Sequence, residues 1–517
     1  MTKQVTRDNS YNAAQDLLGR NINNERANKI AVIDSKGSYT YAEIDAQARQ
    51  FANLLCELGI HAEQRIVLCL DDTVAFPVCF LGAILAGIVP IPVNTRLAEK
   101  DYKFILNDSR ARMLVLTPDL LMHFDPHLKN HPNLDHVFLV GGTSGSYKTL
   151  NRAMSKSSTR FQTARTKADD ICFWLYTSGT TGVPKGAVHL HSHLMDTANL
   201  YAIPVLEIKS DDVVYSAAKL FFAYGLGNGL TFPFAVGATT VLLEGPPTPS
   251  AVAEILTENQ PTIFYGVPTL FAILLASEEL PNREATRLRL CVSAGEALPE
   301  DLLKRWQSHM GCDILDGLGS TEMLHIFLSN RQGDVRPNCS GLAVPGYKLR
   351  IVDDNNNEVP NGELGNLHVC GPTSAIMYWN QRQKSRDTFR GQWTVTGDKY
   401  RVDEEGYYIY GGRTDDMLKV GGIYVSPFEV EGALIAHDAI LEVAVIGHPD
   451  SDKLVKPKAF VVLKEGYEPT DTLVCQLKSF VRGTLAEFKY PRWIEFVNEL
   501  PKTATGKIQR FKLRASL

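Results

Sequence analysis

Residues 261–311, PTIFYGVPTLFAILLASEELPNREATRLRLCVSAGEALPEDLLKRWQSHMG, decide the fold class. Two short apolar runs, 261–268 and 288–296, are typical of buried strands. Each is followed by a longer segment with the apolar spacing of a helix, 268–280 and 299–311. Strands that alternate with helices predict a parallel sheet with helices packed on its faces. Ligands of such sheets bind beside the carboxyl ends of the strands, where we expect the site of this chain.

The same alternation extends toward the N-terminus. A predicted strand at 239–244 and a predicted helix at 249–260 precede the decisive stretch. Residues 40–115 repeat the pattern, with a helix that ends at Gly59, a buried strand, a second helix and a short strand at 89–93. The expected fold class is therefore α/β, with two doubly wound sheets in a large N-terminal region.

The pattern changes twice in the C-terminal part of the chain. After about residue 340, short alternating strands separated by turns indicate a small β-barrel. Near Asp415 a third pattern begins, with short strands, two helices and a basic tail that suits either an anionic ligand or solvent. We therefore predict an N-terminal domain, 1–414, whose barrel-like part covers about 340–414, and a smaller α+β C-terminal domain, 415–517.

Composition narrows the class of protein. Hydrophobic residues make up 44% and charged residues 21%, as in ordinary soluble proteins, and a net charge of −5 without a basic stripe gives no reason to expect a nucleic-acid partner. Nine scattered cysteines without a C-x-x-C pair indicate reduced thiols. The N-terminal residues lack the apolar core of a signal peptide, and the most apolar stretch, 78–93, is too short to span a membrane. We expect a soluble cytoplasmic protein.

Residues 176–193, YTSGTTGVPKGAVHLHSH, form the most distinctive local motif. After a predicted strand, their Ser, Thr and Gly residues can present N–H groups and hydroxyls to phosphate oxygens, and Lys185 adds a point charge. A kinase-type phosphate loop requires G-K-[S/T], which is absent here. The histidines at 189, 191 and 193 are spaced two residues apart, without the H-E-x-x-H pattern or a Cys/His cluster of a metal site.

Residues 176–186 resemble the signature of adenylate-forming enzymes, the superfamily of acyl-CoA synthetases, adenylation domains and firefly luciferase. DGLGSTE (316–322), TGD (396–398), GRTDDMLKVGGIYVSPFEVE (412–431) and PKTATGKIQR (501–510) resemble further motifs of this family, in its order and over nearly the whole chain. The resemblance implies that ATP and a carboxylic acid react to an acyl-adenylate and pyrophosphate. It assigns ATP and acid binding to the N-terminal domain and makes the C-terminal domain mobile.

The resemblance also implies individual roles at the nucleotide. Attack of a carboxylate on the α-phosphate is catalysed mainly by charge neutralisation and positioning. Glu322 would bind Mg²⁺, Thr321 the α-phosphate, and Asp398 both ribose hydroxyls. The remaining residues implied at ATP are Thr177, Ser178, Gly179, Thr180, Thr181 and Lys185 at the β- and γ-phosphates, Gly295 and Glu296 at the adenine wall, Asp316, Gly317, Leu318 and Gly319 in the DGLG segment, and Tyr410 and Arg413 beside the nucleotide.

One position departs from the family pattern. The family usually has Tyr at the position of Leu318, where the ring stacks on adenine. Leu318 can still form an apolar wall, but the aromatic stacking at this position is lost.

The C-terminal motifs imply a second half-reaction. Lys507 would bridge the attacking carboxylate and the α-phosphate during adenylation. Asp415 matches the hinge of the family, about which the small domain rotates so that a thiol can enter. Gly421 and Gly422 would let a pantetheine arm pass, and Lys419 would enter the site in that conformation. Free CoA is the favoured acceptor because the chain stops directly after the Lys507 motif. A separate carrier protein is the alternative, and a homodimer is expected only by analogy with the family.

The acid must be inferred from residues 219–234 and 319–330. Neither stretch offers an obvious cation for a second carboxylate or an obvious anion for an ammonium group. Both resemble the corresponding stretches of benzoate-CoA ligases. The positions implied around the ring are Ala223, Tyr224, Gly319, His325 and Ile326, of which His325 can donate a hydrogen bond to a carboxylate or a ring substituent.

The sequence therefore predicts an acid–thiol ligase, an AMP-forming aryl-CoA ligase that uses MgATP and CoA on benzoate or a related small aromatic acid. A 4-hydroxybenzoate, aminobenzoate or medium-chain fatty acyl ligase, and an enzyme that loads a carrier protein, are alternatives. A catalytically silent acyl-nucleotide sensor and an oxygen-dependent luciferase are two further alternatives.

Overall fold

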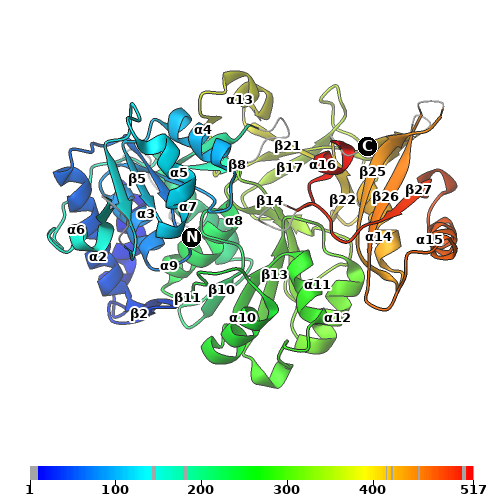
Figure 1. The fold of residues 1–517 in the computed structure, drawn as a ribbon, viewed down its shortest axis with the longest axis horizontal. Helices are drawn as coiled ribbons and strands as arrows, with labels where there is room; N and C mark the ends of the chain where they lie inside the picture. The colour runs from blue at the N-terminus through cyan, green and yellow to red at the C-terminus, as the bar shows by residue number, and fades with distance from the viewer. Residues whose placement is uncertain are drawn as a thin grey trace.

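The computed structural model of this chain describes residues 10–142, 147–177, 183–414, 416–420, 423–451, 454–502 and 508–515. Figure 1 shows the N-terminal part in blue on one side, the central part in green and the C-terminal part in orange and red on the other. The two sheets with parallel strands lie mainly in the blue and green parts, as the sequence predicts. None of the helices in the described part of the chain combines the length and apolarity needed to cross a membrane.

The stretch 261–311 lies in a nine-stranded sheet. Its order is β16 (Leu342–Ala343), β15 (Ile326–Ser329), β14 (Ile314–Gly319), β13 (Leu290–Ala294), β12 (Ile263–Gly266), β10 (Val213–Ser216), β11 (Thr239–Val241), β1 (Ile30–Asp34) and β2 (Gly37–Thr40). The six central strands, β14 to β1 in this order, pair in parallel, and β2, β15 and β16 add antiparallel edges. The predicted strands and helices of this stretch are confirmed.

Helices cover the nine-stranded sheet. α10 (Pro249–Glu254), α11 (Pro268–Ala276) and α12 (Glu300–Met310) pack on it through a shared apolar core. α12 ends at Gly311, whose φ of +69° is the left-handed conformation that glycine adopts without strain. The other helices of this region are α7 (His191–Thr197), η2 (Ala198–Ala202), α8 (Ala223–Leu226), η3 (Gly227–Thr231), α9 (Phe232–Val236), η4 (Ile255–Asn259) and η5 (Arg283–Ala285).

The second doubly wound sheet is formed by residues 65–149. Its five parallel strands follow the order β4 (Val89–Pro92), β3 (Arg65–Cys69), β5 (Met113–Leu116), β6 (His136–Leu139) and β7 (Lys148–Thr149). The capping box between Thr40 and Glu43 begins the long helix of residues 41–57. The helices are α1 (Ala13–Ile22), α2 (Tyr41–Glu57), α3 (Ala75–Leu85), α4 (Glu99–Ser109), η1 (Pro118–Leu120), α5 (Leu121–Leu128) and α6 (Leu150–Met154).

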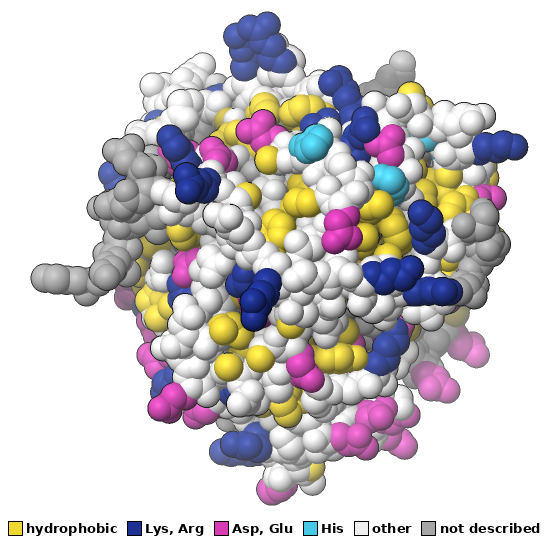
Figure 2. All heavy atoms as spheres, turned by 90° about the vertical axis from the view of Figure 1, so that its left-hand side faces the viewer, with side chains coloured by type: hydrophobic (Ala, Val, Ile, Leu, Met, Phe, Trp, Pro, Cys, Tyr) yellow, Lys and Arg dark blue, Asp and Glu magenta, His cyan; other side chains and the backbone are white. Residues whose placement is uncertain are grey.

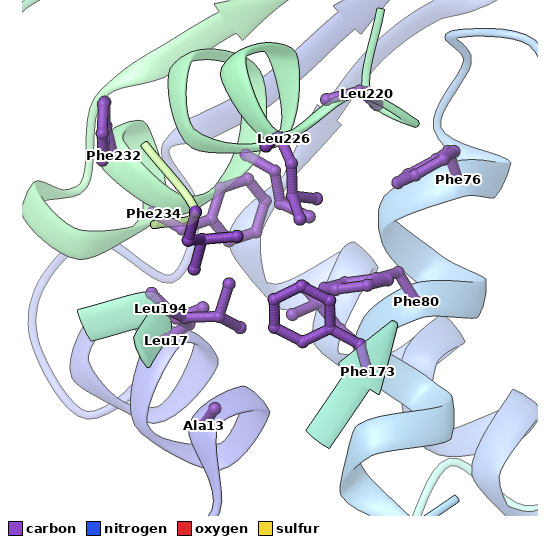
Figure 3. Close-up of a cluster of buried hydrophobic side chains, with 14 of the residues drawn as sticks. Ala13, Leu17, Phe76, Phe80, Phe173, Leu194, Leu220, Leu226, Phe232 and Phe234 are labelled. Carbon is purple, nitrogen blue, oxygen red and sulfur yellow. The ribbon is translucent and has the colours of Figure 1, made fainter. Parts of the chain in front are cut away.

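Aromatic and aliphatic side chains from both halves meet in the core that Figure 3 shows. Phe80 of α3 lies between Phe76, 6.0 Å away between ring centroids, and Phe173, 5.5 Å away. α3 is buried over nearly its whole length, which explains why its sequence is apolar on all sides rather than on one stripe. This core packs against α8 and α9 and so supports the segment predicted to hold the acid.

Two antiparallel sheets lie next to the nine-stranded sheet. A three-stranded sheet contains β19 (Met377–Tyr378), β9 (Lys185–Leu190) and β8 (Ile171–Thr177). The predicted barrel-like part is a five-stranded antiparallel sheet in which β17 (Lys348–Val352), β18 (Gly365–Cys370) and β21 (Trp393–Val402) are neighbours. β20 (Phe389–Arg390) and β22 (Tyr408–Arg413) pair with β21, and α13 (Arg382–Thr388) precedes β20.

The C-terminal part mixes helices and strands, as predicted. It contains β23 (Leu418–Val420), β24 (Ile423–Val425), α14 (Pro427–Ile435), β25 (Ile440–Pro449), β26 (Val455–Leu463), α15 (Asp471–Thr484), η6 (Glu487–Lys489), β27 (Trp493–Phe496) and α16 (Arg510–Ala515). The basic tail includes a third helix, α16, which the sequence does not predict. Arg510 contacts both oxygens of buried Glu431 at 2.8 Å, and Arg514 contacts Asp416 at 2.7 Å, so two of its basic side chains have structural partners.

Figure 2 shows the face on the N-terminal side of the molecule. Lys and Arg side chains lie among Asp and Glu side chains there, and apolar side chains fill the spaces between them. The charges on this face are mixed in sign, in line with the modest net charge of −5.

Candidate active site

The Gly- and Thr-rich loop joins two strands of a hairpin. Thr177 at the end of β8 pairs with Lys185 at the start of β9, so both ends of the loop lie side by side. Tyr176 donates a hydrogen bond to Asp108 at 2.7 Å and Gln381 donates one to the Pro184 carbonyl at 3.1 Å, which fixes the base of the loop. Ser178, Gly179, Thr180 and Thr181 lie outside the described residues.

Thr321 and Glu322 lie in the turn between β14 and β15. Gly319 is required before this turn, because a Cβ there would lie 2.8 Å from the backbone carbon and oxygen of His325. The Ala375 N–H donates to the Glu322 carbonyl at 2.7 Å and holds the turn against the segment that leads into β19. The turn therefore has a fixed backbone on which the side chains of Thr321 and Glu322 are placed.

The histidines after the loop are structural. Burial lowers the pKa of His189 to about 4, so this ring is neutral. Its Nε2 lies 2.9 Å from the Thr321 carbonyl, which can only accept, so Nε2 carries the proton. Its Nδ1 lies 3.0 Å from Nδ1 of His193. The backbone N–H of Ala13 donates to Nδ1 of His191, and among the described residues no cluster of metal ligands of the His, Cys, Asp and Glu type occurs.

Lys185 and Glu322 are connected by a tyrosine. The Tyr378 hydroxyl donates to Glu322 Oε1 at 2.6 Å, and Lys185 Nζ lies 3.5 Å from the same hydroxyl and 4.6 Å from the centroid of its ring. Sequence reasoning identifies Lys185 and Glu322 but misses Tyr378, because an aromatic residue in a short strand has no distinguishing pattern.

Asp398 and Arg413 face each other on neighbouring strands. They are register partners in β21 and β22, and Arg413 Nη1 lies 3.3 Å from Asp398 Oδ1. The backbone of Gly397 has a φ of +77°, and a Cβ there would lie 2.9 Å from the Arg413 guanidinium. The ring of Tyr410, on β22, packs on Tyr400 and on Phe428 of α14.

These pairs form one charged region at the edges of the sheets. Burial and the Glu322 carboxylate raise the pKa of Tyr378, and the positive charge of Arg413 lowers it in part. We call Lys185, Glu322, Tyr378, Asp398 and Arg413 the polar edge. It offers two cations and two carboxylates, which suits a ligand with both phosphates and hydroxyl groups.

The predicted adenine wall follows β13 and includes part of β14. Gly295, with a φ of +96°, and Glu296 come directly after β13, and Gly317, Leu318 and Gly319 end β14. Burial raises the pKa of the Asp316 carboxyl well above its usual range. Ser293 is its register partner, and the Ser293 hydroxyl and Asp316 Oδ1 have no hydrogen-bond partner among the described residues.

His325 lies three residues after Glu322 in a different environment. Aromatic rings surround it, with centroids at 4.5 Å for Phe232, 5.4 Å for Tyr201 and 5.6 Å for Tyr224. Burial lowers the pKa of His325 to about 3, so the ring is neutral. Ala223 is buried at the start of α8, and buried Ile326 begins β15 next to the histidine.

Asn228 determines which nitrogen of His325 carries the proton. His325 Nε2 lies 3.1 Å from Asn228 Oδ1, an acceptor, so Nε2 donates and Nδ1 is the free acceptor of the ring. Nδ1 and Asn228 Nδ2 have no partner among the described residues. The sequence predicts that His325 can donate a hydrogen bond to the acid. In the structure the N–H of the ring donates to Asn228 instead. We call Tyr201, Tyr224, Asn228, Phe232 and His325 the His325 cluster.

The local backbone makes room for this cluster. Asn228 lies in the π-helical turn η3, and such turns are frequent at functional sites. A Cβ at Gly227 would lie 2.3 Å from His325 Cδ2, so only glycine fits beside the ring. The Tyr224 hydroxyl reaches the Val292 carbonyl at 3.2 Å. Sequence reasoning misses Asn228, although the Gly-Asn-Gly run, unusual inside a helix, is visible in the sequence.

Several predicted residues cannot be placed. Lys507, Asp415, Gly421 and Gly422 lie outside the described residues, and only the backbone of Lys419, in β23, is described. Their roles, and the domain boundary at 414, stay predictions.

The residues present fit a magnesium ion bound together with phosphates. The Tyr378 hydroxyl donates to Oε1 of Glu322, whereas Oε2 makes no hydrogen bond among the described residues. Oε2 is therefore a hard oxygen ligand at the polar edge. Mg²⁺ is usually bound through one or two carboxylates and the phosphates of the substrate, rather than by a cage of protein ligands. A single carboxylate in this position is therefore sufficient.

Comparisons with known proteins show which family the chain resembles. A family model described as AMP-binding enzyme matches residues 20–379, and one described as AMP-binding enzyme C-terminal domain matches residues 429–507. The chain is 56% identical to a benzoate–CoA ligase of Thauera aromatica, over 98% of this chain and 96% of the relative.

Two solved structures are also similar. One is a benzoate CoA ligase from Burkholderia xenovorans, with a TM-score of 0.92 and 50% identity over 98% of this chain and 100% of the other. The second is the anthranilate CoA ligase AuaEII in complex with anthranoyl-AMP, with a TM-score of 0.94 and 44% identity over 98% of this chain and 97% of the other.

Proposed function

Because the chain belongs to the AMP-binding enzyme family, we propose that it is an AMP-forming aryl-CoA ligase whose acid is benzoate. In this reaction benzoate attacks the α-phosphate of ATP, pyrophosphate leaves, and the thiol of CoA then displaces AMP from the benzoyl-adenylate. The observation that carries the proposal is the segment 319–326. It holds Glu322 at the polar edge and, three residues later, neutral His325 among aromatic rings.

The polar edge would bind the nucleotide. Lys185 and the loop residues that follow Thr177 would hold the β- and γ-phosphates, which leave together as pyrophosphate. Thr321 would donate to the α-phosphate, Asp398 would accept the ribose hydroxyls, and Arg413 would hold Asp398 in place. Glu322 would bind Mg²⁺, which lowers the negative charge that benzoate meets at the phosphates. Lys507 would bridge the benzoate carboxylate and the α-phosphate.

The His325 cluster would hold the acid. A benzoate ring is flat and uncharged, and aromatic walls from Tyr224 and Phe232 match it by area and shape. His325 is neutral, so the cluster adds no cation that would keep the benzoate carboxylate away from the α-phosphate. Among the described residues of this cluster no charged side chain occurs, which disfavours dicarboxylates and amino acids.

The C-terminal part would serve the second step. Rotation about Asp415 would withdraw Lys507 and bring Lys419 into the site, and Gly421 and Gly422 would leave space for the pantetheine arm of CoA. The cytoplasm is the expected compartment, and a homodimer is the expected assembly by analogy with the family.

The test is to incubate the protein with MgATP, CoA and benzoate and to identify the products by mass. AMP together with benzoyl-CoA is the expected result. Parallel reactions with 4-hydroxybenzoate, 2-aminobenzoate and octanoate rank the acids, and we expect the highest kcat/KM for benzoate. AMP release with octanoate but not with benzoate would refute the assignment of the His325 cluster to an aromatic acid.

A further inference from the structure

Tyr378 connects two groups of the polar edge that carry opposite charges. Its hydroxyl lies 2.6 Å from Glu322 Oε1 and 3.5 Å from Lys185 Nζ, and the Lys185 ammonium lies 4.6 Å from the centroid of its ring. The ring thus supports the lysine by a cation–π contact while the hydroxyl binds the carboxylate.

The backbone fixes Tyr378 to the segments that carry both groups. Tyr378 pairs with Ala187 on β9, the strand that begins at Lys185, and the Trp379 N–H donates to the Gly186 carbonyl at 2.8 Å. Ala375, three residues earlier, donates its N–H to the Glu322 carbonyl at 2.7 Å. A short stretch of chain is therefore joined both to the phosphate-loop hairpin and to the turn of Glu322.

The side chain of Tyr378 is fixed as well as its backbone. Tyr378 is buried, and its ring packs on Phe389 at 5.2 Å between centroids. The Ser385 hydroxyl accepts from the Tyr378 N–H at 2.9 Å. The Tyr378 hydroxyl has one proton to donate. Because a carboxylate can only accept and an ammonium can only donate, the hydroxyl donates to Glu322 and accepts from Lys185.

We propose that Tyr378 is a positioning residue for the adenylation step, which orients Glu322 for Mg²⁺ and Lys185 for the leaving phosphates. With Oε1 fixed by the tyrosine, Oε2 is presented to the metal, and the carboxylate cannot rotate away when ATP is absent. That the step is adenylation rests on the proposed function, whereas the choice of Tyr378 rests on its contacts.

Tyr378→Phe tests the hydroxyl, because the variant keeps the ring and its contacts with Lys185 and Phe389. Loss of an outer hydrogen bond to a metal ligand commonly weakens metal binding by about 10- to 100-fold. We expect the half-saturating Mg²⁺ concentration for ATP binding, measured by calorimetry without any acid, to rise about 10-fold. Adenylation, measured by pyrophosphate exchange, falls about 10-fold and recovers at high Mg²⁺.

Two further measurements separate positioning from folding. Thioester formation from supplied benzoyl-adenylate and CoA stays at the wild-type rate in Tyr378→Phe, because that step does not use Glu322. Tyr378→Leu, which also removes the cation–π contact with Lys185, weakens ATP binding further at every Mg²⁺ concentration. The matched control is Tyr147→Phe, which removes a hydroxyl outside the polar edge that donates to Asp125 at 2.6 Å, and it behaves as wild type.

The inference is wrong if Tyr378→Phe binds MgATP with the wild-type dependence on Mg²⁺, or if both half-reactions slow by the same factor. Its failure is distinct from failure of the proposed function. A wild-type protein that binds MgATP but does not convert benzoate would refute the proposed acid, and the calorimetric comparison of the tyrosine variants would still decide the role of Tyr378.

Discussion

The polar edge and the His325 cluster are separated by only three residues of one turn, yet they are built in opposite ways. Glu322 and Arg413 are partly exposed, and every charged side chain of the polar edge has a partner. His325 is buried and neutral, and it retains an acceptor, Nδ1, without a partner among the described residues. The first region is organised around charge and the second excludes it.

This difference shows how one turn can serve two substrates that repel each other. Phosphates need cations, and a metal ligand needs a carboxylate, so the polar edge combines cations with carboxylates. An aromatic ring needs apolar walls, and burial there turns even a histidine into a neutral side chain. If this comparison is correct, substitutions in the two regions change different kinetic constants.

The largest effect is expected for Glu322→Gln, which removes the charge of the proposed metal ligand. Removal of one group that stabilises a charged transition state typically lowers the rate by about 100- to 1,000-fold. Pyrophosphate exchange with ATP should fall by this factor, while the Kd for benzoate, measured by calorimetry, stays unchanged. Glu300→Gln, at the start of α12 and outside both regions, is the control. A comparable loss of benzoate affinity would show that the two regions are not separate.

Asp398→Asn should have the next largest effect. The substitution keeps the size of the side chain but removes the carboxylate that pairs with Arg413. Hydrogen bonds to a charged group contribute about 1.5–3 kcal/mol, so we expect the KM for ATP to rise about 10-fold or more. Steady-state kinetics at saturating benzoate measures the KM for ATP. An unchanged KM for ATP would remove Asp398 from the nucleotide site.

His325→Ala should act on the acid alone. The substitution removes a wall of the cluster and leaves Asn228 Oδ1 without its donor, so the KM for benzoate should rise about 10-fold and the preference among ring substituents should change. The KM for ATP should not change. Asn228→Ala should have a smaller effect in the same direction, and the double variant should be less than additive because the two residues form one hydrogen-bonded unit. Additive effects would mean that Asn228 does not act through His325.

The smallest expected effect concerns stability and pH. The pKa of His325 is lowered from 6.5 to about 3, so the unfolded chain binds a proton below pH 6.5 that the folded protein does not. The stability contributed by the neutral ring is complete above pH 6.5 and is lost as pH falls, by up to about 1.4 kcal/mol for each pH unit. Urea unfolding at pH 7 and pH 5 should show a shallower loss for His325→Gln than for wild type. Equal slopes would show that the ring is protonated in the folded protein.

Much of the fold follows from local sequence patterns. The strands and helices of residues 261–311 are correctly predicted because each is a short buried run or a periodic helix bounded by Gly or Pro. Helix α16 is missed because a basic segment has no apolar stripe, and Arg510 and Arg514 gain their helix-stabilising partners, Glu431 and Asp416, only from distant parts of the chain.

The site is predictable to the extent that its residues belong to motifs. Lys185, Glu322, Asp398 and Arg413 come from separate motifs, and the structure brings them to one edge. Tyr378 and Asn228 cannot be recognised in this way, because their roles arise from contacts across the fold, at 56 and 97 residues from Glu322 and His325 respectively.

The most direct test of the account is to supply benzoate labelled with ¹⁸O in its carboxylate, together with MgATP and CoA, and to determine the mass of the AMP released. Attack of the carboxylate on the α-phosphate leaves one carboxylate oxygen on phosphorus when CoA takes the benzoyl group. The account therefore predicts AMP that carries one ¹⁸O atom and pyrophosphate that carries none. Unlabelled AMP, or label in pyrophosphate or phosphate, would contradict nucleotidyl transfer at the polar edge.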